Sequence, residues 1–84
     1  MKYSLTFSKH ALKGLEKIHE PHYSSIKNVI INLTENPKPQ GCKKLKGRDG
    51  FRVRVGNYRI IYDVNDEILI VDVLNVGHRK DIYR

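Results

Sequence analysis

Apolar and polar residues alternate with two different periods along the chain, helical in the first half and strand-like in the second. Residues 3–7 come first and alternate strictly, which predicts a strand with one buried face. Two stripes at helical spacing follow, and Ser8 and Glu20 precede them as candidate caps. Pro21 suits the first turn of the second helix, and the prolines of residues 36–39 end it. The stripes consist of Ala11, Leu12, Leu15 and Ile18 in the first helix and of Tyr23, Ile26, Ile30 and Leu33 in the second.

The strand period takes over after residue 41 and predicts four more strands joined by short turns. Gly56 and Asn57 are expected to form a two-residue hairpin turn, and Asn65 and Asp66 the next one. The fold class is therefore α+β: an N-terminal strand, an antiparallel helical hairpin and an antiparallel strand meander, with the helices packed on one face of a single sheet. The four predicted strands cover residues 43–46, 51–55, 58–64 and 68–76.

The alternation also predicts which residues face the helices and which stay on the open face of the sheet. With a two-residue turn, Arg54 lies opposite Arg59, and like charges so placed destabilise a strand pair unless an anion or a carboxylate lies between them. The same register brings Arg59 opposite Asp72, so Arg59 has two equal interpretations, as phosphate ligand or as partner in a structural ion pair. The helix-facing set is Val53, Val55, Tyr58, Ile60, Tyr62, Leu69, Val71 and Val73, and the open face carries Arg52, Arg54, Arg59 and Ile61.

The net charge indicates which class of partner the chain binds. The chain has 84 residues and a formal net charge of +7, and residues 43–59 hold seven basic residues against one acid. This length predicts a single domain, residues 1–84, with a thin core. Clustered cations favour a polyanionic partner, and planar guanidinium groups match phosphate, so Arg52 and Arg54 indicate a nucleic-acid protein. The alternative is that the charge serves solubility alone. A basic edge that would attract RNA, or would only be solvated, consists of Lys43, Lys44, Lys46 and Arg48.

Several other classes are disfavoured. Cys42 is the only cysteine, so the chain has neither an intrachain disulfide nor a thiolate metal cluster. His10, His19 and His22 have no cysteine or carboxylate at ligand spacing, and a solvated face explains them better than metal ligation. No apolar run reaches membrane-spanning length and the N-terminus lacks the apolar region of a signal peptide, so we expect a cytoplasmic protein without a membrane partner.

The terminal segment 77–84 is the second concentration of titratable and hydrogen-bonding groups. His78 lies close to Arg79 and Asp81, and an imidazole can transfer a proton near neutral pH. Tyr83 follows a polar tail and is a candidate for stacking on a base. These residues join the candidate site if the last strand delivers them to the edge of the arginine face.

Four segments carry a family resemblance: Leu-Lys-Gly at 45–47, Tyr-Arg-Ile-Ile-Tyr at 58–62, Val-Gly-His-Arg at 76–79 and Ile-Tyr at 82–83. Through them, and over essentially its whole length, the chain resembles the RelE/ParE superfamily of bacterial toxin–antitoxin toxins, in particular the RelE-like branch. The resemblance implies a sheet with two N-terminal helices, in agreement with the pattern above. It further implies a metal-independent endoribonuclease, without cofactors, that enters the ribosomal A site and cuts mRNA. A RelB-like antitoxin would hold it inactive, and operator DNA would be bound only through the antitoxin complex.

The resemblance also assigns roles to single positions. The matching residues are Arg52 and Arg54 for the two basic positions of the active-site strand, Arg59 for the arginine after the tyrosine, Arg79 for the arginine of the closing motif and Tyr83 for the C-terminal tyrosine. Well-known members have lysine at the first two positions, whereas arginine stays protonated at physiological pH. This difference leaves His78, Tyr83 or charge stabilisation alone to replace a lysine base.

The implied reaction is attack of the ribose 2′-hydroxyl on the adjacent phosphate, with cations stabilising the dianionic transition state. Two alternatives stay open at this point. One is an inhibitor of DNA gyrase, as in the ParE-like branch, for which the basic face would be incidental. The other is an RNA-binding module without catalysis.

Overall fold

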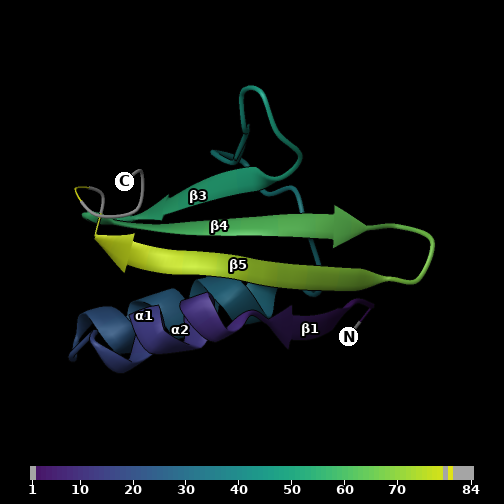
Figure 1. Ribbon diagram of the computed structural model, residues 1–84. Helices are drawn as coiled ribbons and strands as arrows, with labels where there is room; N and C mark the ends of the chain where they lie inside the picture. The colour runs from purple at the N-terminus through teal and green to yellow at the C-terminus, as the bar shows by residue number, and fades with distance from the viewer. Residues whose placement is uncertain (1, 79, 81–84) are drawn as a thin grey trace.

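The computed structural model describes residues 2–78 and residue 80. Its elements are β1 (Ser4–Phe7), α1 (Lys9–Glu16), α2 (His22–Asn32), β2 (Lys43–Lys44), β3 (Phe51–Val55), β4 (Tyr58–Asn65) and β5 (Ile70–His78). The strands form one sheet in the order β1-β5-β4-β3-β2, with β1 parallel to β5 and all other neighbours antiparallel. Both helices lie on one side of this sheet, which confirms the predicted α+β class (Figure 1).

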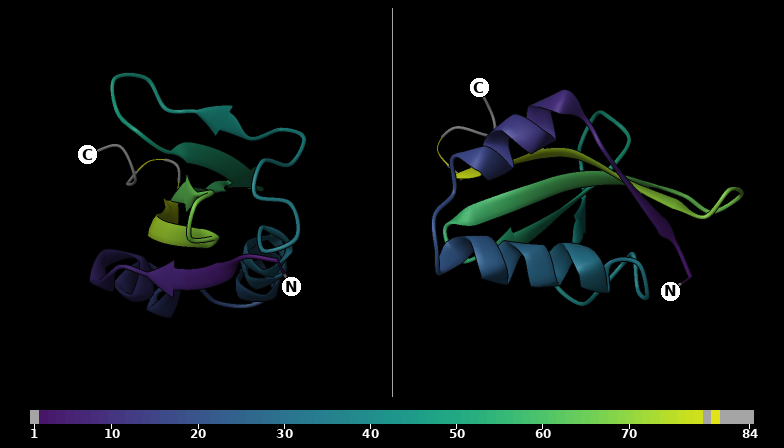
Figure 2. Two further views of the ribbon diagram at one scale, coloured as in Figure 1. Left: turned by 90° about the vertical axis from the view of Figure 1, so that its right-hand side faces the viewer. Right: turned by 90° about the horizontal axis from the view of Figure 1, so that it is seen from below.

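The helices run in opposite directions beneath the sheet, with strands visible between them when the molecule is seen from below (Figure 2). α1 packs against β5, and α2 lies under β3. The opposite face of the sheet carries no helix, and this open face is where the arginines were predicted. Within the described part of the chain, no helix is long and apolar enough to cross a membrane.

Ser8 and Gly14 place α1 against β5. The Ser8 hydroxyl accepts a hydrogen bond from the Ala11 backbone N at 3.0 Å and donates one to the Leu74 carbonyl oxygen at 2.7 Å, so the predicted N-cap is confirmed. A Cβ on Gly14 would overlap the carbonyl oxygen of Val76. Glycine is therefore what lets this helix approach the strand so closely.

Pro21 occupies the N-cap position of α2, one residue later than the predicted cap Glu20, but Glu20 still stabilises the start of the helix. The Glu20 carboxylate accepts hydrogen bonds from the hydroxyl and the backbone N of Ser24, at 2.7 and 2.9 Å. These two bonds favour the charged carboxylate and lower the pKa of Glu20. The helix ends at Asn32, before the predicted proline segment.

The helix-facing side of the sheet builds a single core with both helices. Tyr62 is fully buried at its centre, stacks on Phe51 with ring centroids 5.8 Å apart, and donates its hydroxyl to the Pro37 carbonyl oxygen at 2.7 Å. Burial raises the pKa of the Tyr62 phenol, because the ionised ring would lose its hydration there. Tyr23 differs from prediction: it is 38% exposed, since it lines an open groove of about 270 Å³ between the helices and β1.

The register between β3 and β4 is the predicted one. Arg54 pairs with Arg59 and Val55 with Tyr58 around the two-residue turn, in which Gly56 takes the positive φ of 61° that such a turn needs.

The register between β4 and β5 differs from prediction. Arg59 pairs with Gly77, so the predicted register of Arg59 opposite Asp72 is wrong, and Asp72 instead pairs with Asp63. One cause is an irregularity between β4 and β5 that leaves Leu74 without a partner residue in the pairing.

The other cause is the turn. Residues 66–69 connect the two strands, not Asn65 and Asp66 alone. The Asn65 side-chain oxygen accepts hydrogen bonds from the backbone N of Glu67 and of Ile68, at 3.0 and 3.2 Å. Leu69, predicted to face the helices, belongs to this connection, has a φ of 55° and is exposed.

Candidate nucleic-acid interface

Cations face each other across neighbouring strands on the open face of the sheet. In one row Lys43 of β2 pairs with Arg52 of β3, and Arg52 pairs with Ile61 of β4. In the next row Arg54 of β3 pairs with Arg59 of β4. Two like-charged pairs at successive positions cost stability unless an anion or a carboxylate lies between them. The arrangement therefore suits phosphate.

Gly77 extends the second row, because it is the β5 partner of Arg59. A Cβ at this position would meet no heavy atom within 4 Å, and its φ lies outside the left-handed region that favours glycine. A side chain at position 77 would therefore find room, and the backbone there does not need glycine.

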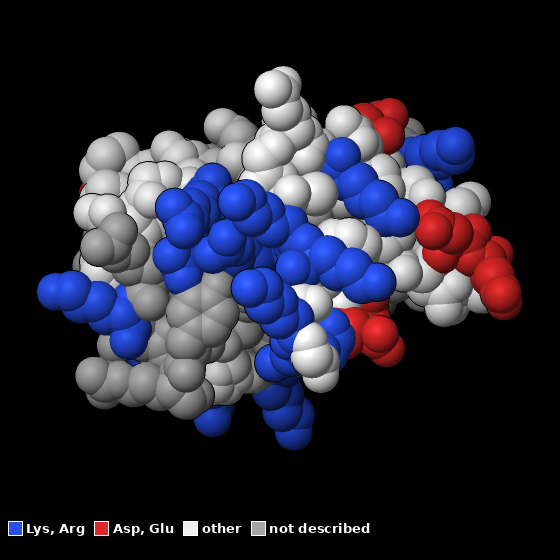
Figure 3. All heavy atoms as spheres, turned by 90° about the horizontal axis from the view of Figure 1, so that it is seen from above, with Lys and Arg blue, Asp and Glu red and all other residues white. Residues whose placement is uncertain are grey.

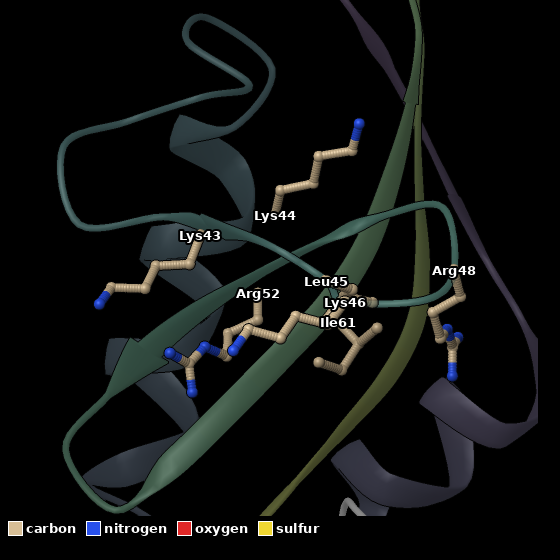
Figure 4. Close-up of a pocket in the computed structure, with 7 residues that line it drawn as sticks. All are labelled: Lys43, Lys44, Leu45, Lys46, Arg48, Arg52 and Ile61. Carbon is tan, nitrogen blue, oxygen red and sulfur yellow. The ribbon is translucent and has the colours of Figure 1, made fainter.

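A pocket of about 510 Å³ lies next to these rows, between the β2–β3 loop and β4. Figure 4 shows Lys43, Lys46 and Arg52 extending to one side of it, with Leu45 and Ile61 between them and Arg48. Its lining residues are Lys43, Lys44, Leu45, Lys46, Arg48, Arg52 and Ile61. The four residues predicted as a basic edge therefore belong to the same hollow as Arg52.

The loop that forms this pocket is held by the Leu45 backbone N, which donates to the Gly50 carbonyl oxygen at 3.0 Å. Gly50 is buried with a φ of 120°, and a Cβ there would lie 3.0 Å from the Tyr62 carbonyl oxygen. The loop can close over β4 only with glycine at this position. As a result Ile61, predicted on the open face, is only 4% exposed.

Seen from above, basic side chains gather in the middle of the open face, and acidic ones lie towards the end of the β4–β5 connection (Figure 3). At that acidic end Asp63 and Asp72 pair across β4 and β5, and Thr6 donates a hydrogen bond to Asp72 at 2.9 Å. Asp66 accepts the Tyr3 hydroxyl at 2.6 Å, which raises the pKa of the tyrosine. The face therefore attracts a polyanion at one end and repels it at the other.

His78 does not join the arginines. It pairs with Tyr58 across β4 and β5, and the two rings meet edge to face with centroids 5.6 Å apart. The His22 ring also lies against this tyrosine, with ring centroids 5.2 Å apart. His78 lines a second pocket, of about 450 Å³, together with His10 of α1. Its ring thus lies on the helix side of the sheet.

Two other predicted site residues, Arg79 and Tyr83, lie outside the described residues. Among the residues that the structure does describe, no group of three His, Cys, Asp or Glu side chains could hold a metal ion. The apolar pocket residues Leu45 and Ile61 were not predicted as part of the site. The available signal was Ile61 itself, an apolar residue at an open-face position two residues after Arg59.

Comparison with known proteins decides the family. A family model described as the ParE toxin of the type II toxin–antitoxin system parDE matches residues 5–83. The chain belongs to the RelE/ParE superfamily of toxins. It is 31% identical over 83 residues to the mRNA interferase toxin RelE of Escherichia coli, covering 95% of this chain and 86% of that protein. It is also 31% identical over 86 residues to the toxin RelG of Mycobacterium tuberculosis, covering 100% of this chain and 99% of that one.

Solved RelE structures share the fold. The RelE chain of the intact Escherichia coli RelBE toxin–antitoxin complex gives a TM-score of 0.79 at 30% identity, covering 90% of this chain and 95% of that one. The archaeal RelE–RelB complex of Pyrococcus horikoshii gives a TM-score of 0.80 at 26% identity. The match covers 96% of this chain and 99% of that one. Together with the family match, these likenesses make the protein a RelE-like toxin of a type II toxin–antitoxin module.

Proposed function

We propose that this RelE-like toxin is an endoribonuclease that cleaves mRNA in the ribosomal A site. The observation that carries the proposal is the pairing of Arg54 with Arg59 on the β3–β4 hairpin, next to the Lys43–Arg52 pair. A rigid hairpin holds these cations in place before substrate arrives, so little reorganisation is needed when charge develops on a phosphate. Support comes from a relative, 31% identical, that is named an mRNA interferase.

The proposed reaction needs no external co-reactant. The ribose 2′-hydroxyl gives its proton to water and attacks the adjacent phosphorus, the bond to the 5′-oxygen breaks, and that oxygen takes up a proton from water. The products are a 2′,3′-cyclic phosphate and a 5′-hydroxyl end. Arg52, Arg54 and Arg59 orient the phosphate and neutralise its extra negative charge, and each such contact contributes about 3 kcal/mol of transition-state stabilisation.

Arg79 and Tyr83 complete the proposed site, Arg79 by assisting the developing charge and Tyr83 by stacking on a base or bonding the nucleotide. His78 is the candidate for proton transfer that the sequence suggests, but its ring lies on the helix side with Tyr58. We therefore assign most of the rate to arginine electrostatics. Metal plays no part in this proposal, because cations of the chain supply the positive charge.

The proposed partners follow from charge. Ribosome-bound mRNA is the substrate, with the basic pocket and its neighbouring residues contacting the phosphate backbone of RNA. A cognate RelB-like antitoxin with acidic segments neutralises the toxin, and support comes from the similar RelE chains that were solved in complex with RelB.

The experiment that tests this function is induction of the toxin in growing cells, with transcript 5′ ends mapped across the transcriptome and plasmid supercoiling measured in the same cultures. We expect new 5′-hydroxyl ends inside coding regions, in phase with codons, and unchanged supercoiling. Relaxed or broken plasmid without new RNA ends would overturn the proposal in favour of a gyrase inhibitor. Growth arrest with neither effect would overturn it in favour of a non-catalytic RNA-binding module.

A further inference from the structure

The pocket of about 510 Å³ beside the arginine rows has two kinds of wall. Among its described lining residues the charged ones are all cations, whereas Leu45 and Ile61 add an apolar surface. Phosphate binding alone would need only the cations. An apolar wall inside a cationic pocket suits an anion that also carries an organic group, because the cations bind the charge and the wall contacts the rest of the ligand.

The apolar wall is built into the fold. Ile61 is 4% exposed on the face that carries no helix, because the β2–β3 loop closes over it with the Leu45–Gly50 hydrogen bond at 3.0 Å. Leu45, half-buried, comes from that loop itself. The two side chains thus meet the pocket from different elements, β4 and the loop, and the glycine at position 50 keeps them together.

Arg52 links this pocket to the proposed phosphate site. It lines the pocket, pairs with Ile61 across β3 and β4, and is followed on the same strand face by Arg54. Alternate residues of a strand lie about 7 Å apart. That spacing is comparable to the length of one nucleotide, so a phosphate at Arg54 and Arg59 leaves its neighbouring nucleoside at the mouth of the pocket.

We propose that this pocket is a nucleobase subsite: the half-buried Leu45 side chain contacts the face of the base next to the cleaved phosphate, above the covered Ile61, and the surrounding cations bind the flanking phosphates. The inference rests on the proposed function, because it takes RNA as the ligand. It adds a contact that is independent of charge. An aliphatic surface accepts the flat face of any base, so the subsite positions the RNA without selecting its sequence.

Methyl NMR of the whole toxin tests this directly. We expect adenosine and cytidine monophosphate to shift the Leu45 and Ile61 methyl signals through the ring current of the base, with the Ile26 methyls of the core as the internal reference. Ribose 5-phosphate and inorganic phosphate should leave the Leu45 and Ile61 methyls in place. Equal shifts with ribose 5-phosphate, or nucleotide shifts that spare both residues, would overturn the subsite.

A pair of matched variants supplies the second readout. Leu45→Ala should weaken binding of adenosine monophosphate by about threefold to tenfold and leave binding of inorganic phosphate unchanged, because it removes apolar contact without adding charge. Leu12→Ala removes the same group from an exposed leucine of α1 and should bind as the parent does. If both variants bind adenosine monophosphate equally well and nucleotides cause no ring-current shifts in the parent, the pocket is a phosphate site without a base subsite.

The proposed function and this subsite can fail separately. Nucleotide-dependent shifts at Leu45 and Ile61 in a toxin that cuts no transcript support the subsite and overturn the ribonuclease. Transcript cleavage without these shifts supports the ribonuclease and overturns the subsite.

Discussion

Arg54 and Arg59 occupy one register position across the β3–β4 hairpin. Arg54 is exposed, so its side chain supports no core. We expect Arg54→Ala and Arg59→Ala to abolish growth inhibition and to slow ribosome-dependent cleavage by roughly a hundredfold or more, the cost of losing a preorganised charge donor. Arg54→Ala should melt at or above the parent's temperature, because it removes a like-charged neighbour.

The control for these variants is Lys27→Ala, which removes an exposed cation from α2 on the helix side. It should remain as toxic as the parent. If Arg54→Ala stays fully toxic while folded, the phosphate role of the arginine pair is wrong. Circular dichroism at the assay temperature separates lost function from lost fold.

His78 provides a contrast at the same scale. Its ring packs on Tyr58 on the helix side, whereas the arginines project from the open face. We expect His78→Gln to cleave within a few-fold of the parent in single turnover. A loss of about a hundredfold that also flattened a sloping pH profile would instead identify His78 as the general base.

Tyr62 gives the fold its own pH dependence. Burial raises the pKa of this phenol above its ordinary value near 10, so above pH 10 the unfolded chain releases a proton that the folded chain keeps. The unfolded state then binds fewer protons, and stability falls as pH rises. We expect the denaturation midpoint in urea to drop above about pH 10, and Tyr62→Phe to reduce that drop.

Tyr62→Phe should also cost roughly 1 kcal/mol at neutral pH, because the Pro37 carbonyl oxygen loses its donor at 2.7 Å. A residual slope is expected from Tyr3, whose pKa is raised in the same direction by its hydrogen bond to Asp66. An unchanged slope in the phenylalanine variant would show that Tyr62 ionises in the folded protein as it does in the unfolded one.

At the scale of elements, the contact of α1 with β5 depends on one missing methyl group. A Cβ on Gly14 would overlap the backbone oxygen of Val76, which cannot rotate away as a side chain would. Gly14→Ala should therefore destabilise the protein by about 1–3 kcal/mol despite the better helix propensity of alanine. The corresponding loss in melting temperature is roughly 5–15 °C.

Gly77→Ala is the matched control for this variant. It adds the same methyl group on the strand that α1 crosses, but into space with no heavy atom within 4 Å. Its melting temperature should stay within a few degrees of the parent's. If the two variants had the same melting temperature, α1 could move away from β5 without a loss of stability.

Elements that depend on local pattern could be predicted from the sequence. Ser8 caps α1, and the Gly56-Asn57 turn sets the Arg54–Arg59 pair, because a two-residue loop leaves the register no freedom. The partner of Arg59 in β5 could not be predicted, since it depends on a four-residue connection and on the irregularity at Leu74. The irregularity moves the buried positions of β5 from Val71 and Val73 before Leu74 to Val76 after it, so the alternation breaks there, but the pattern alone does not say which strand of the pair has the extra residue.

The pocket was missed for a related reason. Alternation placed Ile61 on the open face correctly, but its burial comes from a loop that bends back over the sheet. That bend needs the φ of 120° at Gly50, a long-range packing requirement against Tyr62 that local sequence does not encode. The pairing of Arg54 with Arg59, by contrast, follows from period and turn length alone, whereas that of Lys43 with Arg52 depends on the longer β2–β3 loop.

At the scale of the whole molecule, the net charge of +7 is unevenly distributed, with cations over the β2–β3 loop and β3 and acids near the β4–β5 connection. A proposed acidic antitoxin should be steered to the basic end, because long-range attraction acts before contact and raises the association rate. Charge reversal should therefore slow association far more on the open face than on the helix side.

We expect Arg54→Glu to lower the antitoxin association rate by about tenfold at low salt, whereas Lys27→Glu, with the same change in net charge, should lower it only slightly. The difference should shrink near 0.5 M salt, where the Debye length falls to about 4 Å. Stopped-flow mixing at two ionic strengths measures both effects. Equal slowing by the two variants would show that the antitoxin responds to total charge and not to the basic face. Recovery of the toxin without any companion chain from cells that carry its native operon would argue against the antitoxin partner itself.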